Sequence, residues 1–372
     1  MKKTILMRAV CFILIIYTLL VPATTVAIAS GGDDTCENFS DVYTESLPTL
    51  ADGVQVGSRL WELFFGDEAE EQTVSLLPGG GVFGVRIKQK YLTVTDARGV
   101  PALKNGDVIL SIDGEEVRTV ADVRRIVERS GGRSLTVRAL HQGSEISVEI
   151  RPTMEGDQYR LGISLRDGAA GLGTVTFIDP RTGLFGGLGH GICDADSGEV
   201  ILMDSGDVCG VILGSIHRGE GGKPGELCGV LTDRDIGDLS LNCECGVFGI
   251  ITDIPASAQQ ISIGRREQVR EGEATIISTL KNGKSAEYKI EIYDIDLSSE
   301  GSKSFRVRVT DETLKALTGG IVRGMSGSPI IQDGKLIGAI THVLVADPTE
   351  GFGIFIENML NSVNATQLQK AA

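Results

Sequence analysis

Residues 324–329, Gly-Met-Ser-Gly-Ser-Pro, stand directly before the apolar pair 330–331 and place a serine between glycines. A glycine two positions before Ser326 and another directly after it allow a sharp turn that leaves the hydroxyl exposed. The backbone amides of Gly324 and Ser326 can then converge as donors on a developing oxyanion. The segment predicts a nucleophile at the start of a strand. The competing interpretation is a hairpin whose small residues serve tight packing alone.

The composition favours a globular protein rich in turns and β-structure. Of the 372 residues, 49 are glycine and 10 are proline, and the glycines show no three-residue period that would indicate collagen. Hydrophobic residues make up 41% and aromatic residues 5%, which excludes wholesale disorder and predicts cores of Val, Ile and Leu. The length suits about two domains, and we expect a mainly β fold.

The charge excludes an obvious nucleic-acid surface. The chain has 35 basic and 50 acidic side chains, so its formal net charge is −15. Such a protein repels phosphate backbones, and no basic stripe interrupts the acidic balance. We therefore expect no nucleic-acid partner.

The N-terminus is typical of an exported chain. Basic residues precede an apolar run over 9–21, and a small-residue segment follows it. This order predicts a signal peptide over 1–30. Alternatively, an apolar stretch continued over 9–28 serves as a membrane anchor, although it is marginal for a span. Residues 31–71 are expected to form a linker with a short helix and no chemistry.

Once Cys11 leaves with the signal, an even number of cysteines remains. They are Cys36, Cys193, Cys209, Cys228, Cys243 and Cys245. An exported chain permits disulfides, but six cysteines allow 15 pairings. A competing zinc site would draw its ligands from His190, Cys193, Cys243 and Cys245. A C-x-C pair is not the C-x₂-C knuckle typical of zinc, so we expect buried thiols or one or two disulfides, no metal and no organic cofactor.

A small β-rich module with two helices is expected over residues 72–153. Apolar alternation predicts strands at 82–87, 91–94, 108–112, 134–140 and 145–151, a short helix from Pro101 and a longer helix at 120–130. Residues 101–114 fit P-A-x-x-x-G-D-x-I-x-x-x-D-G and closely resemble a PDZ domain.

The PDZ resemblance implies that a peptide adds to the module as an extra strand. It places the groove between residues 91–95 and the helix 120–130. The expected peptide-binding positions are Lys90, Tyr91, Leu92 and Thr93. Capture of a C-terminal carboxylate and docking of an internal segment both stay open.

The second domain, residues 154–372, is glycine-rich, and its short apolar runs suggest a barrel or sandwich. Its G-x-S-G-x-P pattern is that of trypsin-like serine peptidases, so we expect a chymotrypsin-like double β-barrel. A serine nucleophile needs a base, most often histidine. His190 is the best of four candidates, because it lies among small residues upstream of Ser326. His141 and His217 are expected to be solvated, and His342 to be structural or to line a pocket.

Longer segments closely resemble the stage IV sporulation protein B peptidase family of endospore-forming bacteria. The resemblance rests on residues 173–180, 188–190, 318–331, 338–343 and 347–349. It implies a signalling serine endopeptidase in the space between forespore and mother cell. There it would cleave itself and a membrane-bound regulatory complex, so that an intramembrane protease can activate pro-sigma-K.

By the same resemblance, Ser326 is the nucleophile, His190 the general base and Asp311 the acid that orients the base. Topology alone also allows Asp204, Asp233 or Asp235 as the acid, and Asp311 would also suit the N-cap of a helix over 312–317.

Two other functions compete with the signalling peptidase. One is an envelope quality-control protease of the HtrA type, which also pairs a PDZ domain with G-x-S-G-x-P but places the peptidase first. The other is a catalytically idle scaffold whose PDZ domain recruits partners. A scaffold would lose nothing if Ser326 were mutated.

Overall fold

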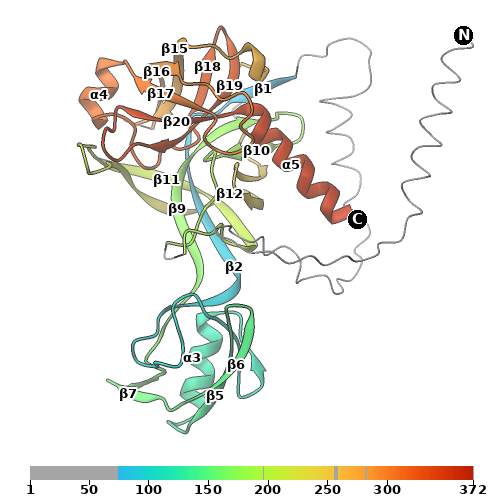
Figure 1. Ribbon diagram of the computed structural model, residues 1–372, viewed down its shortest axis with the longest axis vertical. Helices are drawn as coiled ribbons and strands as arrows, with labels where there is room; N and C mark the ends of the chain where they lie inside the picture. The colour runs from blue at the N-terminus through green and yellow to red at the C-terminus, as the bar shows by residue number, and fades with distance from the viewer. Residues whose placement is uncertain (1–73, 196, 255–258, 281–282, 372) are drawn as a thin grey trace, which may run out of the picture. The chain divides into compact units, whose positions relative to one another are not determined.

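The computed structural model describes residues 74–195, 197–254, 259–280 and 283–371, with side chains through Val363. The expected signal or anchor at 1–30 and the linker at 31–71 lie outside these residues. The described chain is mainly β and forms two barrels and a PDZ module (Figure 1). Within this described part, no helix is long and apolar enough to cross a membrane.

The C-terminal barrel is closed by six antiparallel strands. In order around the barrel they are β15 (Gly272–Thr279), β16 (Ser285–Tyr293), β17 (Phe305–Val309), β20 (Glu350–Phe355), β19 (Lys335–Val343) and β18 (Pro329–Gln332). Closure gives every strand a neighbour on both sides, which leaves no free edge. Inward-facing aliphatic side chains fill the barrel, and Ile276, Ile290, Val307, Ile330 and Ile340 are fully buried.

The N-terminal barrel is a second ring of six strands. In order they are β2 (Val82–Asp96), β9 (Ser164–Ile178), β10 (Leu184–Gly187), β13 (Gly246–Ile251), β12 (Glu226–Cys243) and β11 (Met203–His217), which pairs with β2 again. Phe83, Phe185, Val208 and Val247 lie at its core. The two rings together are the expected chymotrypsin-like double β-barrel.

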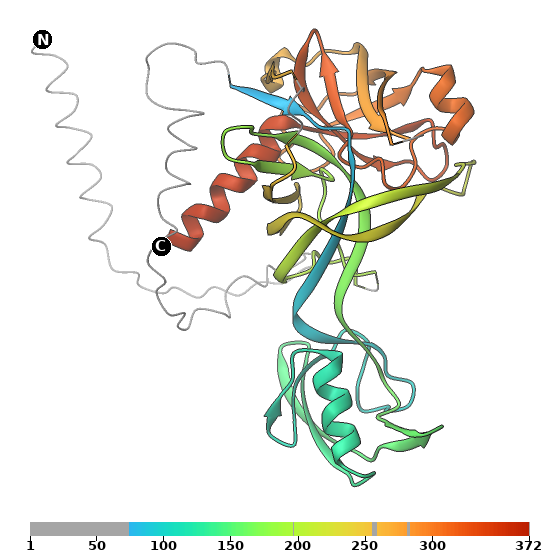
Figure 2. The same ribbon diagram turned by 180° about the vertical axis from the view of Figure 1, so that it is seen from behind.

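Two long strands, β2 and β9, are shared between the N-terminal barrel and the PDZ module. The first part of β2 and the last part of β9 belong to the barrel, whereas their other ends join the module (Figure 2). Its remaining elements are β3 (Val108–Ile112), β4 (Glu115–Glu116), α3 (Val120–Arg129), β5 (Leu135–His141), β6 (Ser144–Ile150), β7 (Thr153–Glu155) and β8 (Gln158–Arg160). The module has its own core, which includes Leu92, Ile112, Ile126 and Val137.

Two details differ from the expectations for the module. Its chain is inserted between β2 and β9, so the barrel begins before the boundary expected at 153–154. The short helix expected from Pro101 is a pair of turns, because the chain turns again at Gly106, whose φ is +91°. The helix expected at 120–130 is α3, whose Thr119 side chain accepts a hydrogen bond from the Asp122 amide.

A third apolar cluster joins the two barrels. It includes Leu76 of β1 (Ser75–Pro78), Phe177 of β9, Phe248 of β13 and Met359 of α5 (Ile356–Ala371). The short strand β14 (Ile261–Ser262) pairs with β1. The 3-10 helix η1 (Arg266–Gln268) and α4 (Glu312–Thr318) complete the elements of the described residues.

Candidate active site

The loop that carries Ser326 is bent by two glycines ahead of β18. Gly324 has a φ of +94° and Gly327 a φ of +93°, a region that favours glycine. A Cβ at Gly327 would lie 2.0 Å from the carbonyl oxygen of Thr174 and 2.5 Å from the amide nitrogen of Leu188. Glycine is therefore required here for space as well as for conformation.

Strand β9 of the other barrel holds this loop from the side. The amide of Thr174 donates to the carbonyl of Ser326 (2.9 Å), and its hydroxyl donates to the carbonyl of Gly324 (2.8 Å). The hydroxyl of Thr176 donates to the carbonyl of Gly327 (2.8 Å). Both threonines are fully buried. Three loop carbonyls are thus fixed by one strand, which sets the backbone around Ser326.

The two amides expected to form the oxyanion hole are unengaged. The neighbouring amides of Met325 and Gly327 donate to Val322 and Ile340. Those of Gly324 and Ser326 donate to no acceptor within the residues that the structure describes. Unengaged donors on a fixed loop are what stabilisation of an oxyanion requires.

The hydroxyl of Ser326 is close to the chain of β19. It donates to the carbonyl oxygen of Thr341 at 2.7 Å, and the side chain of Ser326 is partly buried. Residue His342 directly follows this carbonyl. The hydroxyl of Ser326 is therefore engaged in this structure and must leave the Thr341 carbonyl before it can attack a substrate.

His190 follows β10 at a strained turn. Leu188 and Gly189 both have a φ of +66°, and a non-glycine residue in this region is uncommon outside strained or functional sites. Nδ1 of His190 lies 2.9 Å from the carbonyl oxygen of Gly191. Because the carbonyl can only accept, Nδ1 donates and Nε2 of a neutral ring keeps its lone pair. Burial lowers the pKa of His190, which favours this neutral form.

His342 also belongs to the site. Its ring centroid lies 4.9 Å from that of His190, and the two planes are tilted by 37°. Burial, helped by the charge of a protonated His190 and by Lys303, lowers the pKa of His342 to about 4. Its Nδ1 is buried and has no hydrogen-bond partner among the residues that the structure describes. The sequence indicated a structural or pocket-lining residue, and the contact with His190 is what sequence could not show.

Close backbone packing brings the two segments together. A Cβ at Gly189 would lie 2.9 Å from the methyl group of Thr341, whose carbonyl accepts from Ser326. On the other side, Gly327 packs against the backbone of Leu188. The predicted nucleophile, the predicted base and the predicted oxyanion amides therefore share one location at the junction of the barrels.

Asp311, the predicted acid, forms its hydrogen bonds with backbone amides away from His190. It is the N-cap of α4, where its Oδ1 accepts from the amide of Leu314 (2.9 Å) and its Oδ2 from the amide of Lys289 (3.3 Å). No hydrogen bond joins Asp311 to His190 in the described part of the chain. The orienting partner of His190 in this structure is a backbone carbonyl, and substitution of Asp311 tests whether this residue also serves as the catalytic acid.

The other acids weighed from sequence have different surroundings. Asp235 accepts from the amide of Gly237 (3.0 Å) within β12. Asp204 lines a pocket next to the PDZ module. Neither is hydrogen-bonded to His190 among the residues described, and the same holds for Asp233.

The cysteines considered for disulfides or zinc are free thiols where the structure describes them: Cys193, Cys209, Cys228, Cys243 and Cys245. Burial raises the pKa of Cys243 and of Cys245, so these thiols stay protonated. Cys36 lies outside the described residues. The set of His190, Cys193, Cys243 and Cys245 does not form a metal-like cluster.

The peptide groove predicted for the PDZ module is displaced by one strand. The strand with Leu92 and Thr93 is paired on both sides, with β3 at Val108 and with β9 at Arg166. It therefore has no free edge to which a peptide could add. Lys90 and Tyr91 instead line the pocket that also contains Asp204.

The free edge next to α3 belongs to the start of β9. Residues Ser164–Asp167 pair with β2 on one side, and no other described strand covers the opposite side. Asp167 also accepts from the amide of Val120, the first residue of α3. The preceding loop, Leu161-Gly162-Ile163, has Gly162 at a φ of +74°. This loop leads directly into the free edge of β9. It lies beyond the module boundary expected at 153, so the sequence analysis did not connect it with peptide binding.

The fold and site together define a serine peptidase with an inserted PDZ domain. Family models agree, matching a SpoIVB peptidase S55 domain at residues 157–360 and a PDZ domain at residues 102–140. The peptidase match covers more than half of the chain. The chain belongs to the SpoIVB peptidase S55 family.

Individual relatives are distant. A curated protein, the putative zinc metalloprotease Atu1380 of Agrobacterium fabrum, is 28% identical over 153 residues, which are 39% of this chain and 40% of that protein. The chain thus spans about two-fifths of that relative. The Rv3671c protease of M. tuberculosis in its active form has 12% identity and a TM-score of 0.30, with 52% of this chain and 73% of that chain covered. The HtrA-type protease AlgW with a decapeptide has 15% identity and a TM-score of 0.32, covering 58% and 55%.

Proposed function

We propose that this serine peptidase is a signalling endopeptidase of endospore formation, exported to the space between forespore and mother cell. It processes itself and cleaves a membrane-bound regulator, which releases an intramembrane protease to activate pro-sigma-K. Membership of the SpoIVB peptidase S55 family supports this role. The N-terminal sequence supports export, with residues 9–28 as an alternative anchor.

The observation that carries the chemistry is the combination of Ser326, the unengaged amides and a neutral imidazole at one place. Ser326 Oγ leaves the Thr341 carbonyl and turns to Nε2 of His190, which takes its proton during attack on the substrate carbonyl. The amides of Gly324 and Ser326 stabilise the tetrahedral oxyanion. His190 then returns the proton to the leaving amine, and water hydrolyses the acyl-enzyme.

The PDZ module presents the substrate to this site. An extended segment of the regulator adds to the edge of β9 at Ser164–Asp167, opposite α3. Binding away from the site lets the peptidase select one protein, since most of the recognition then lies outside the cleavage point.

Self-cleavage of the full chain tests the chemistry. We expect the parent and Ser328→Ala to trim themselves over time, as followed by intact mass. Ser326→Ala is expected to stay whole. Ser328→Ala is the matched control, because the buried hydroxyl of Ser328 has no hydrogen-bond partner in the described part of the chain. A fluorophosphonate probe labels the parent and Ser328→Ala but not Ser326→Ala. Labelling or trimming of Ser326→Ala would overturn the assignment.

Pro-sigma-K processing tests the signalling role. In a sporulating strain that lacks its own family member, the full chain is expected to restore processing, and Ser326→Ala is not. If the chain is labelled by the probe but restores nothing, the enzyme assignment stands and the sporulation role is wrong.

A further inference from the structure

Three metal-binding side chains meet on the hairpin formed by β11 and β12. His217 ends β11, and Glu226 begins β12 directly opposite it in the register. Cys228 follows two residues later and so faces the same side as Glu226. Their ligand atoms all lie within 4.8 Å of one another. In the described part of the chain, this is the one group of three or more such residues with metal-site spacing.

An irregularity of the hairpin aligns the three. Leu213 is opposite Gly229 and Ile216 is opposite Leu227, so two residues of β11 face Cys228 alone. Such a bulge bends and twists the strand locally. Here it accompanies the approach of the thiol of Cys228 to the imidazole of His217.

The spacing already fits a tetrahedral zinc ion. Nδ1 of His217 lies 3.1 Å from Oε1 of Glu226, and Sγ of Cys228 lies 3.5 Å from that Nδ1 and 3.9 Å from that Oε1. In a tetrahedral zinc site with ordinary bond lengths, two ligand atoms of the nitrogen, oxygen or sulfur type lie about 3.4 to 3.6 Å apart. Shifts of a few tenths of an ångström therefore suffice to bind the ion.

The donor set suits zinc in charge and softness. A thiolate, a carboxylate and a neutral imidazole carry two negative charges, which balance the charge of the ion. Imidazole and thiolate together favour zinc over calcium or magnesium. Binding releases the thiol proton of Cys228 to solvent. The side chains of His217 and Glu226 are 66% and 48% exposed, so the ion enters from solvent and a water takes the fourth position.

The hairpin is bonded to the oxyanion loop. Leu227, which lies between two of the ligands, donates through its amide to the carbonyl of Arg323 at 2.9 Å. The amide of Arg323 donates in turn to the carbonyl of Gly225, also at 2.9 Å. The carbonyl of Arg323 and the amide of Gly324 belong to one planar peptide unit. The bond from Leu227 therefore sets the direction of the Gly324 amide, the predicted oxyanion donor.

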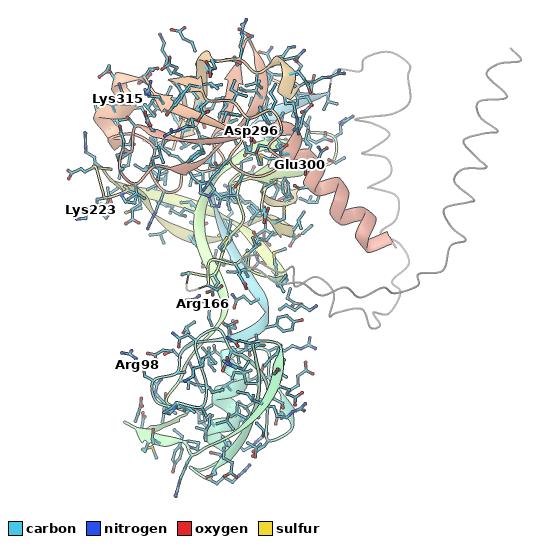
Figure 3. All side chains as sticks on the ribbon, in the orientation of Figure 1. Arg98, Arg166, Lys223, Asp296, Glu300 and Lys315 are labelled. Atoms are coloured by element: carbon cyan, nitrogen blue, oxygen red, sulfur yellow. The ribbon has the colours of Figure 1, made fainter. Side chains whose placement is uncertain are left out.

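The turn of the hairpin is also anchored. Arg218 donates to the carbonyls of Lys315 and Ala316 in α4, and the amide of Gly219 donates to the carbonyl of Thr318. Figure 3 labels Lys223 in this turn and Lys315 in α4. With its turn fixed to α4, the hairpin transmits a change at the ligands mainly to Leu227 and Arg323.

We propose that His217, Glu226 and Cys228 bind a zinc ion, and that the ion holds Leu227 so that the Gly324 amide stays directed at the oxyanion. The binding is independent of any activity, whereas the effect on catalysis rests on the proposed peptidase function. Zinc acts here as a positioning element and touches no reacting atom.

Cobalt binding tests the site without activity. The full chain is prepared metal-free as Ser326→Ala, which excludes self-cleavage, and is titrated with Co²⁺. We expect a thiolate-to-cobalt charge-transfer band that zinc abolishes. Cys228→Ser loses the band, and Cys193→Ser, which removes an exposed free thiol elsewhere, keeps it. His217→Ala weakens binding at least about tenfold, and His141→Ala does not.

A band that persists in Cys228→Ser would overturn the site. A disulfide between Cys228 and Cys36 in the purified full chain, found by peptide mapping without reduction, would overturn it as well.

Steady-state kinetics test the coupling. We expect chelation to lower kcat of the parent on a peptide substrate by about tenfold at unchanged KM, since the loss is confined to the oxyanion. Zinc restores kcat in the parent but not in Cys228→Ser. If the chain binds cobalt but zinc does not change kcat, the proposed effect on catalysis is wrong and the metal site stands. Cobalt binding in a chain that no fluorophosphonate labels would overturn the peptidase function and leave the site intact.

Discussion

The segment that carries Ser326 and the segment that carries His190 are built in opposite ways. Strand β9 donates three hydrogen bonds to carbonyls of the nucleophile loop, and Gly327 fits against Thr174 and Leu188 with no room for a Cβ. The imidazole of His190, in contrast, has one hydrogen bond among the described residues, to the carbonyl of Gly191.

The position of the nucleophile and the protonation of the base therefore depend on different features of the structure. The nucleophile loop is fixed by backbone geometry, which no change of pH alters. Burial instead lowers the pKa of the base His190, and burial together with the charge of His190 lowers the pKa of its neighbour His342. We therefore expect steric changes to be most damaging at the loop, and pH to act mainly on the histidines.

The largest effect is expected from Gly327→Ala. The added Cβ would lie 2.0 Å from the carbonyl oxygen of Thr174, so the loop must move away from β9. We expect fluorophosphonate labelling of Ser326 to slow by about 100-fold or more, as for a displaced oxyanion donor.

Gly334→Ala is the matched control for this change. Gly334 also has a positive φ, +75°, but a Cβ there meets nothing within 4 Å. We expect it to cost about 1 kcal/mol of unfolding free energy through backbone strain alone and to leave labelling unchanged. Equal labelling rates in the two variants would show that the loop is not held as rigidly as the contacts indicate.

The histidines are expected to make both activity and stability fall in acid. Because burial lowers the pKa of His190, the acid limb of kcat/KM should lie below pH 6.5, the ordinary value for histidine. A pH profile of probe labelling measures it. An acid limb above pH 6.5 would contradict the desolvated environment of the base.

The stability effect has a defined direction. The pKa of His342 falls from 6.5 to about 4 on folding, so the unfolded chain binds more protons between these values. Its contribution is therefore present above pH 6.5 and is lost as the pH falls to about 4, by up to about 2 kcal/mol once solvent screening of this partly exposed ring is allowed for. His342→Phe is expected to flatten this part of the pH dependence of urea unfolding. An unchanged slope would assign the acid sensitivity to other groups.

The site was predictable from sequence where its signal is local. Gly324, Ser326 and Gly327 lie in one short motif, and His190 stands among small residues, so both segments could be proposed as catalytic from sequence. Their hydrogen bonds to Thr174 and Thr176 were not, because nothing near residue 326 indicates which strand will lie beside it. The contact between His190 and His342 depends in the same way on a long-range pairing.

The fold shows the same division. Turns and strands of the PDZ module follow from residues 101–114 and their neighbours, and so does helix α3. The sharing of β2 and β9 between module and barrel has no local signature, and this sharing moved the peptide edge from Leu92 to Ser164–Asp167. The cluster of His217 and Cys228 likewise depends on strand register and a bulge.

The smallest effect is expected from Asp311→Asn, which tests whether a carboxylate supports the weakly held base. Asn caps a helix about as well as Asp, and the side-chain oxygen can still accept from the amide of Leu314. With Asp311 acting only as the N-cap of α4, the unfolding free energy should change by less than about 1 kcal/mol, and kcat should stay within a few-fold of the parent.

Asp311→Ala separates the cap from the acid. It should lose about 1 kcal/mol of unfolding free energy, again with little effect on kcat. If Asp311 turned to His190 in the working enzyme, both variants would lose activity, and the asparagine variant would lose about 10⁴-fold by favouring the wrong tautomer. Because the carbonyl of Gly191 already accepts from Nδ1, we expect the tautomer, and with it the activity, to survive both substitutions.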